Sequence, residues 1–171
     1  MVRHPPGFFV LAMPIRLQLA IPPLERSWLE RAYLDWLHEL AVVSRATPPS
    51  TESLAREQIS DWLQDRAVDL FVLRRDEERA GFACVERVLD GGARLREFYV
   101  VPDLRRLGVG SHAANLLFDR YAAQWQVEVL QSDRAALRFW GSVIQRYALD
   151  RRREERADGH VRYVFPSRSA K

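Results

Sequence analysis

Two glycines that follow a pair of arginines are the residues whose spacing points most directly to chemistry. Arg105, Arg106, Gly108 and Gly110 lie in segment 97–111, which has the pattern of a strand, a turn and the start of a helix. Without Cβ atoms at the helix entrance, the first free N–H groups can converge on an anion, and the helix dipole favours negative charge there. We therefore expect a phosphate or diphosphate site, with both arginines at its rim. A tight turn is the alternative role for the glycines alone.

The stretch 99–110 resembles the acetyl-CoA-binding motif of the GNAT superfamily of N-acetyltransferases. In that motif a strand ending Val-x-Pro is followed by Arg or Gln, then by Gly three residues later, then by Gly or Ala. Arg105, Gly108 and Gly110 occupy these three positions. The resemblance extends more loosely along most of the chain. The string 139–144 is similar to a subgroup of bacterial acetyltransferases, most of which have no assigned substrate.

This resemblance implies acetyl-CoA as the acyl donor, no metal, and a small-molecule or peptide amine as the acceptor. The backbone near Val100 would pair with the pantetheine arm, and the amides from Arg106 to Ser111 would hold the diphosphate. The cofactor-binding residues expected in this way are Tyr99, Val100, Arg105, Arg106, Leu107, Gly108, Val109, Gly110, Ser111 and Asp133.

Two residues depart from the family pattern. The family usually has Asn at the position of Asp133, and often Tyr, a proposed acid for the departing thiolate, at the position of Trp140. Asp133 is expected to cap its helix or to contact the cofactor. Tyr147 is an alternative candidate for this acid. Both Trp140 and Tyr147 nevertheless fit the core, because they follow a helical apolar spacing. A thiol with a pKa near ~8.5 leaves tolerably well as the thiolate, so the acid is optional.

Glu97 is the candidate catalytic base. An alkylammonium with a pKa near ~10.4 must lose a proton before it can attack a thioester. Glu97 has the same pleat parity as Tyr99 in the strand before the loop, where desolvation would raise its pKa toward a useful range. An ion pair of Glu97 with Arg94 or Arg96 is the alternative interpretation, and Glu86 is a weaker candidate base.

Other functions fit the sequence less well. Gly108, Gly110 and Ala113 also satisfy a dinucleotide-binding fingerprint, with Glu128 at the distance of a ribose-binding acid, but segment 102–107 separates the strand from the first glycine. A non-catalytic acyl-CoA-binding or sensing module of the same fold is a further alternative.

Three chemistries are not supported by the residues. The four histidines show no metal-ligand spacing. Ser111 and His112 are neighbours on a helix and face apart, so they form no hydrolase pair. Arginines at 151–153 are followed at once by Glu154 and Glu155, which favours a solvated hairpin over nucleic-acid binding.

Hydrophobic periodicity predicts the elements that position these residues. Helices are expected at 24–40 and about 51–66, and strands at 69–74, 80–88 and 94–101, joined by short turns. A helix at 108–125, a strand at 127–130, a helix capped by Asp133 and a hairpin at 151–156 and 160–165 complete the chain. The predicted fold class is α+β (mixed α/β), GNAT-like, with a central, mostly antiparallel, twisted sheet of about six or seven strands flanked by about four helices.

Composition is consistent with one globular domain, expected at 14–168. The 171 residues are 47% hydrophobic and 29% charged, which excludes a disordered chain, a fibre and a disulfide scaffold. The positively charged side chains are almost all arginines, since Lys171 is the only lysine. The net charge of +3 is weak evidence for nucleic-acid binding.

The sequence also carries expectations about the ends and the compartment. The single cysteine, Cys84, lies in an apolar stretch and fits the reducing cytoplasm. The apolar run 8–13 is too short to span a bilayer. Because Met13 is an alternative start of translation, 1–13 is treated as an N-terminal extension. The oligomeric state stays open, with a homodimer among the alternatives.

Overall fold

The structure is a computed structural model that describes residues 14–45 and 52–169. This part of the chain contains the mixture of strands and helices that the α+β class predicts, which confirms that class. The elements are β1 (Ile15–Leu19), α1 (Arg26–Ser44), α2 (Glu52–Gln64), β2 (Val68–Arg75), β3 (Glu78–Val88), β4 (Gly92–Val100), α3 (Val109–Arg120), β5 (Gln124–Leu130), α4 (Arg134–Tyr147), β6 (Arg152–Glu155) and β7 (His160–Pro166). The expected extension 1–13 lies outside the described residues.

The strands form one seven-stranded sheet in the order β1-β2-β3-β4-β5-β7-β6. All neighbours are antiparallel except β4 and β5, which are parallel and are connected through α3. A parallel pair needs such a crossover, whereas the short turns between β2, β3 and β4 allow only antiparallel neighbours. The predicted meander, crossover and closing hairpin are therefore confirmed.

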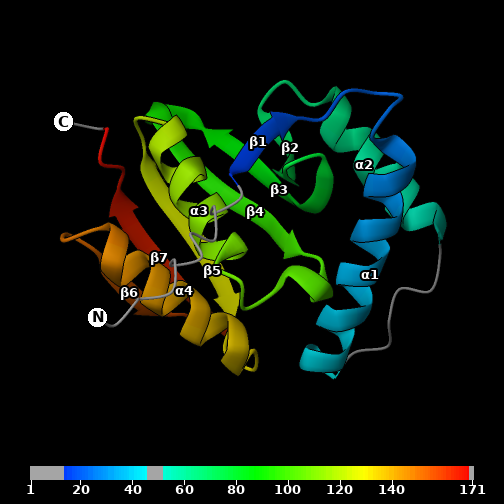
Figure 1. The fold of residues 1–171 in the computed structure, drawn as a ribbon. Coiled ribbons are helices and arrows are strands. Elements are labelled where there is room, and N and C mark those ends of the chain that lie inside the picture. The colour runs from blue at the N-terminus through cyan, green and yellow to red at the C-terminus, as the bar shows by residue number, and fades with distance from the viewer. Residues whose placement is uncertain (1–13, 46–51, 170–171) are drawn as a thin grey trace, which may run out of the picture.

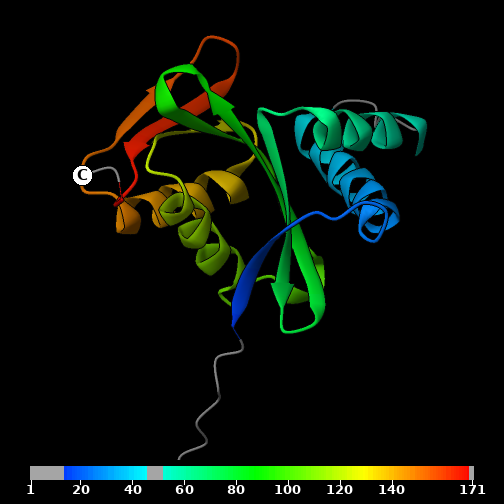
Figure 2. The same cartoon turned by 90° about the horizontal axis from the view of Figure 1, so that it is seen from above.

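Helices cover both faces of the sheet. α1 and α2 lie on one face, the α1/α2 face, and α3 and α4 on the other, the α3/α4 face (Figures 1 and 2). Fully buried Phe118, Trp125 and Phe165 lie in the core on the α3/α4 face, where the Phe118 ring centroid is 5.1 Å from that of Trp125 and 4.9 Å from that of Phe165. Leu29 and Ile59 are fully buried in the separate core on the α1/α2 face.

The prediction that the crossover helix continues to Trp125 is wrong. α3 ends at Arg120, and Tyr121 already has extended backbone angles (φ −115°, ψ 122°). Trp125 belongs to β5, where it is the register partner of Ala93 in β4 and of Phe165 in β7. Apolar residues on both sides of the end of α3 at Arg120 fit a helical period as well as a strand period. The apolar pattern alone therefore predicts a helix that is too long.

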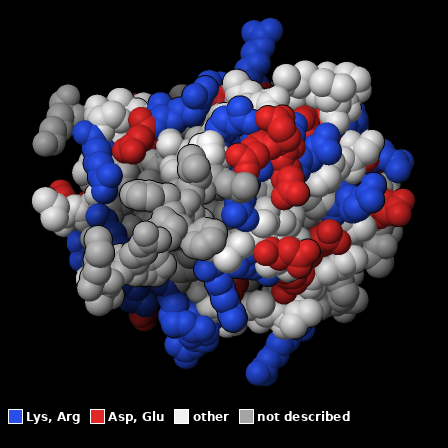
Figure 3. Space-filling model, in the orientation of Figure 1, with Lys and Arg blue, Asp and Glu red and all other residues white. Residues whose placement is uncertain are grey.

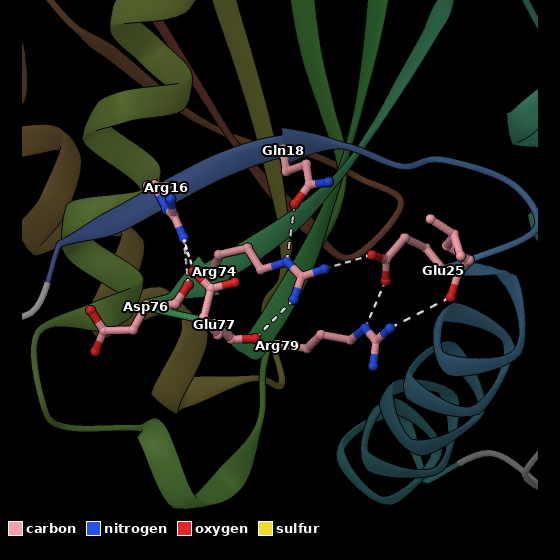
Figure 4. Close-up of polar contacts among 8 residues, drawn as sticks. Arg16, Gln18, Glu25, Arg74, Asp76, Glu77 and Arg79 are labelled. Carbon is pink, nitrogen blue, oxygen red and sulfur yellow. Dashed lines mark hydrogen bonds and ion pairs between the residues drawn. The ribbon is translucent and has the colours of Figure 1, made fainter.

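A buried ion cluster, the Glu25 clamp, holds the start of α1 against the sheet (Figure 4). The Glu25 carboxylate, with a side chain only 3% exposed, accepts from Arg74 Nη2 at 2.6 Å and from Arg79 Nε at 2.7 Å. Arg74, on β2, also donates to Gln18 Oε1 of β1 at 3.1 Å. The carboxylate therefore joins α1 to β2 and β3, and Arg74 extends the clamp to β1. Two guanidinium groups offset the desolvation of this one carboxylate.

The surface mixes charges of both signs. On the face in Figure 3 acidic side chains gather over the half that carries α1, and arginines are interspersed around them. None of the helices within 14–45 and 52–169 has the length and apolar character that a bilayer crossing requires.

Candidate active site

A cleft opens where β4 and β5 stop pairing. Their parallel ladder joins only Ala93–Leu95 to Trp125–Val127, although β4 continues to Val100 and β5 to Leu130. Beyond this ladder the strands diverge (Figure 1), and a cleft of about 1120 Å³ lies between β4, β5, α1 and α4. Among the described residues, the backbone edges that face the cleft have no strand partner there, which leaves backbone groups available to a ligand.

Most of the residues predicted for the site line this cleft. They are Glu97, Tyr99, Val100, Arg105, Arg106, Gly108, Gly110, Ser111 and Asp133. Leu107 and Val109 do not line it: the Leu107 side chain is exposed, and that of Val109 is buried in the core on the α3/α4 face. Any contact of these two residues with a ligand in the cleft would come from their backbone.

The start of α3 presents backbone donors without a cap. Gly108 is the N-cap residue, has φ +79°, and provides no side-chain cap. The first helical hydrogen bond runs from the His112 N–H to the Gly108 carbonyl at 3.0 Å, so three amides ahead of it have no partner inside the helix. Those of Gly110 and Ser111 belong to residues that line the cleft. Such an arrangement favours an anion.

The two glycines of the motif serve different purposes. Gly108 has a left-handed backbone that L side chains rarely adopt, although a Cβ there would meet no atom within 4 Å. At Gly110 a Cβ would lie 3.2 Å from the Phe139 ring of α4. The first glycine therefore shapes the turn, and the second allows α4 to pack closely against the start of α3.

Arg105 lies at the cleft, and several of its N–H donors are already engaged within the protein. Its guanidinium donates to the Val100 carbonyl at 2.8 Å and to both carboxylate oxygens of Glu39 at 2.8 and 2.9 Å, and its amide donates to the Pro102 carbonyl. It also lies over the Tyr99 ring, 5.4 Å from the centroid. Arg105 thus braces the loop against α1. A direct contact of Arg105 with a cofactor stays a prediction.

A bulge in β4 sets the direction of Glu97. Cys84 of β3 is the register partner of Glu97, whereas the next residue, Val85, is opposite Leu95, so Arg96 is an extra residue. Leu95 consequently packs into the core on the α3/α4 face, while Tyr99 packs into the core on the α1/α2 face. Glu97 shares the parity of Tyr99, as predicted, and therefore projects from the α1/α2 face at the cleft.

Burial changes the acidity of Glu97. Desolvation raises the pKa of its carboxyl from the ordinary 4.5 to about 8, against the opposing positive charge of Arg96. No hydrogen bond or ion pair within the described residues involves this carboxylate, and Arg94 and Arg96 pair with Glu86 instead. The alternative of a salt-bridged Glu97 is therefore not what the structure has.

Two neighbours of Glu97, Tyr33 and Cys84, remain uncharged at neutral pH. Desolvation first, and the charge of Glu97 second, raise the pKa of Tyr33 and that of Cys84 well above their ordinary values. The Tyr33 ring is stacked on Trp36, with centroids 5.6 Å apart, and Trp36 lines the cleft. The side chains of Tyr33, Trp36 and Cys84 thus give Glu97 neutral surroundings, and Arg96 is the charged neighbour that lowers its pKa.

The remaining nominated residues have structural partners. Asp133 Oδ1 accepts from the Ala136 amide at 2.8 Å, so Asp133 caps α4 as well as lining the cleft. Trp140 is buried against Phe98, with ring centroids 5.1 Å apart. The Tyr147 hydroxyl donates to the exposed Asp119 at 2.7 Å, the pKa of Tyr147 is raised to about 12 mainly by burial, and Tyr147 does not line the cleft.

Several other cleft residues have no role in the acetyl-transfer site predicted from the sequence. Arg94, Arg96 and His160 line the cleft, and so does Glu128, which accepts from Arg162 at 2.7 Å. Only the strand register, set by the bulge and by the insertion of β7 beside β5, brings them to one place. Within the part of the chain that the structure describes, no group of three or more His, Cys, Asp and Glu side chains is arranged for a metal ion.

Comparisons with known proteins agree with this geometry. The sequence model of a family described as "Acetyltransferase (GNAT) family" matches residues 27–142. Among curated proteins, no sequence matches this chain.

Solved structures share the fold at low sequence identity. An acetyltransferase from Thermus thermophilus has 16% identity and a TM-score of 0.71, covering 91% of this chain and 98% of that one. The ribosomal-protein-S18-alanine N-acetyltransferase from Escherichia coli has 20% identity and a TM-score of 0.60, with 90% and 94% coverage. Spermidine N-acetyltransferase from Vibrio cholerae, in complex with CoA and spermine, has 10% identity and a TM-score of 0.67, with 91% and 97% coverage.

Proposed function

The chain belongs to the acetyltransferase (GNAT) family, and on that premise we propose that it transfers the acetyl group of acetyl-CoA to a primary amine. The amine attacks the thioester directly while both substrates are bound, without an acyl-enzyme. One observation carries the proposal: Gly110 and Ser111, whose amides are uncapped at the start of α3, line the same cleft as Glu97. Cys84 is no nucleophile here, because its thiol is fully buried and its pKa is raised.

The residues present fit acetyl-CoA. The free amides around Gly110 suit its diphosphate, and Arg106 adds positive charge beside them. Beyond Leu95 the edge of β4 has no strand partner among the described residues, and it suits the amide groups of the pantetheine arm, which the family resemblance places near Val100. The Val100 carbonyl itself already accepts from Arg105. A structural relative from Vibrio cholerae is in complex with CoA. When bound, acetyl-CoA supplies an activated acetyl group.

Glu97 acts as the base that prepares the amine. At neutral pH an alkylammonium holds its proton and has no lone pair for attack. The raised pKa of Glu97, about 8, makes its carboxylate a stronger base than an ordinary glutamate, and proton transfer passes directly or through one water molecule. Binding both substrates in one cleft aligns the amine with the thioester.

Neither of the two positions considered for an acid, Trp140 and Tyr147, supplies one to the departing thiolate. Trp140 stands at the position where the family often has Tyr, and the Tyr147 hydroxyl is held by Asp119 away from the cleft. A thiol with a pKa near ~8.5 is a good enough leaving group for this to cost little. We propose that the protein works in the cytoplasm, where reducing conditions keep Cys84 as a thiol.

The test combines calorimetry with a thiol-release assay. Titration of acetyl-CoA into the folded protein should give one saturable site, and a panel of small amines and peptides should release CoA only when an acceptor is present. Absence of heat would refute the cofactor assignment. Binding without acceptor-dependent release across the panel would instead favour a non-catalytic acyl-CoA-binding module.

A further inference from the structure

We propose that the acceptor amine carries a carboxylate, and that Arg94 and Arg96 bind this carboxylate while Glu97 receives the proton of the amine. This inference rests on the proposed function and specifies the class of its acceptor.

The two arginines lie on the α1/α2 face of the sheet, from which Glu97 also projects. Ala93 and Leu95 are buried in the core on the α3/α4 face, so the alternation of a strand directs Arg94 to the opposite face. Arg96 is the extra residue of the bulge and is close enough to Glu97 for its charge to lower the pKa of that carboxyl. Both arginines line the cleft, and their side chains are 38% and 43% exposed.

These guanidinium groups are incompletely paired. Both donate to the same oxygen, Glu86 Oε2, at 3.4 Å from Arg94 and 3.2 Å from Arg96. Within the described residues, the Nε of Arg94 is buried and has no hydrogen-bond partner. One carboxylate therefore serves two cations through long contacts, and a buried donor stays unused. Planar guanidinium groups match a carboxylate in geometry as well as in charge.

The carboxylates of the cleft, in contrast, are largely occupied. Glu39 pairs with Arg105, Glu128 pairs with Arg162, and Asp133 accepts from the amide of its own helix. Glu97 is the cleft carboxylate without such a partner among the described residues. A polycationic acceptor would meet one base and two repelling arginines, whereas an amine with a carboxylate complements all three groups.

The spacing along β4 sets the length of a suitable acceptor. Arg94 and Glu97 are three residues apart, which is roughly 10 Å along an extended strand, and Arg96 is adjacent to Glu97. An amine and a carboxylate separated by a few methylene groups can bridge such a distance between flexible side chains. A series of ω-amino acids from glycine to 6-aminohexanoate therefore samples the range.

The experiment compares matched acceptors that differ in the carboxylate. 5-Aminopentanoate and pentylamine have similar ammonium groups, so the ratio of their kcat/KM values reports the carboxylate alone. We expect a ratio of about ten or more in the unaltered protein, as for a charge-assisted hydrogen bond. The double variant Arg94→Gln, Arg96→Gln should bring the ratio below about three. Any effect of Arg96 on the Glu97 base changes both substrates equally and cancels in the ratio.

Arg152→Gln is the matched control, because Arg152 is an exposed arginine on β6 and does not line the cleft. It should keep the ratio of the unaltered protein. Ratios near one for every ω-amino acid and its matched amine in the unaltered protein would overturn the inference while leaving acetyl transfer intact. An unchanged ratio in the double variant would also overturn it.

A second readout does not depend on turnover. Ligand-observed NMR with pentanoate, which has no amine, should detect binding to the protein saturated with CoA, and the double variant should lose it. If pentanoate does not bind the unaltered protein, the carboxylate site is refuted. If pentanoate binds but no amine is acetylated, acetyl transfer fails while the anion site stands.

Discussion

Replacing Glu97 by Gln should remove the pH dependence that this residue contributes to acetyl transfer. Glutamine keeps the size of the side chain but cannot accept the proton of the amine. The pKa of Glu97, raised to about 8 by burial, means that its carboxylate is the minor form at neutral pH. Since the base must be deprotonated to act, activity should rise as the pH rises through 8.

The magnitude follows from the titration. With a pKa of about 8, roughly a tenth of Glu97 is ionised at pH 7 and roughly nine tenths at pH 9, so kcat/KM gains about tenfold from this group. An ordinary glutamate, at 4.5, would gain nothing over this range. Loss of a general base typically costs about 10²- to 10⁴-fold, and that deficit should be larger at pH 9 than at pH 7.

The assay measures CoA release by Glu97→Gln and by the unaltered protein between pH 6 and 9.5 with one acceptor. The ammonium of the acceptor also titrates, so the quantity to plot is the ratio of the two kcat/KM values, from which that contribution cancels. Tyr33 and Cys84 stay neutral across this range because their pKa values are raised. A ratio that is flat with pH, or close to one, would refute the role of Glu97.

Four further outcomes are expected. Gly108→Glu should weaken acetyl-CoA binding at least tenfold by calorimetry, because it adds a negative charge beside the free amides. Gly91→Glu is the control, because Gly91 has φ +76° and a Cβ there would also meet no atom within 4 Å. An equal loss of acetyl-CoA affinity in both variants would mean that backbone strain, and not the added charge, is responsible. Asp133→Ala should lower the free energy of unfolding by about 1 kcal/mol through loss of the α4 cap, while acetyl-CoA affinity changes less than about threefold; a larger change would indicate direct contact. Glu25→Gln should lower the free energy of unfolding in urea by about 3–5 kcal/mol, because two arginines lose their buried partner. Glu77→Gln, at an exposed pair with Arg16, should cost less than about 1 kcal/mol, and similar losses would argue against the clamp. Glu97→Gln should also raise the melting temperature at pH 8.5 more than at pH 5. When folding raises the pKa of a carboxyl, the folded protein loses stability as the pH rises from the pKa of the unfolded state to that of the folded state. An equal change in melting temperature at both pH values would therefore contradict the burial of Glu97.

Local patterns predicted the elements well because each carries a period of its own. The apolar spacing of α1 and the alternation in β7 need no distant information, and the short turns of the meander leave only antiparallel neighbours. The end of α3 was misjudged because Tyr121, Ala123 and Trp125 fit a helix as well as a strand. That ambiguity is resolved by the partners of Trp125 in β4 and β7, which are distant in sequence.

The candidate site was predictable only where it is local. The loop with Gly108 and Gly110 is a contiguous motif, so its position at the helix start followed from sequence. The pairing of Arg105 with Glu39 and the nearness of Tyr33 to Glu97 depend on how α1 lies on the sheet. The bulge at Arg96 leaves no mark in residue type, so nothing in the alternation of β4 could assign Arg94 and Arg96 to the cleft.

The short ladder between β4 and β5 divides the backbone of the sheet into two panels. One panel contains β1 to β4 and the other β5, β7 and β6, and three residue pairs form the seam between them. A ligand whose amide groups hydrogen-bond to both β4 and β5 would bridge this seam and add hydrogen bonds that the protein alone does not make. We therefore expect stiffness around the seam to depend on occupancy, with slower amide hydrogen exchange at 96–100 once acetyl-CoA is bound.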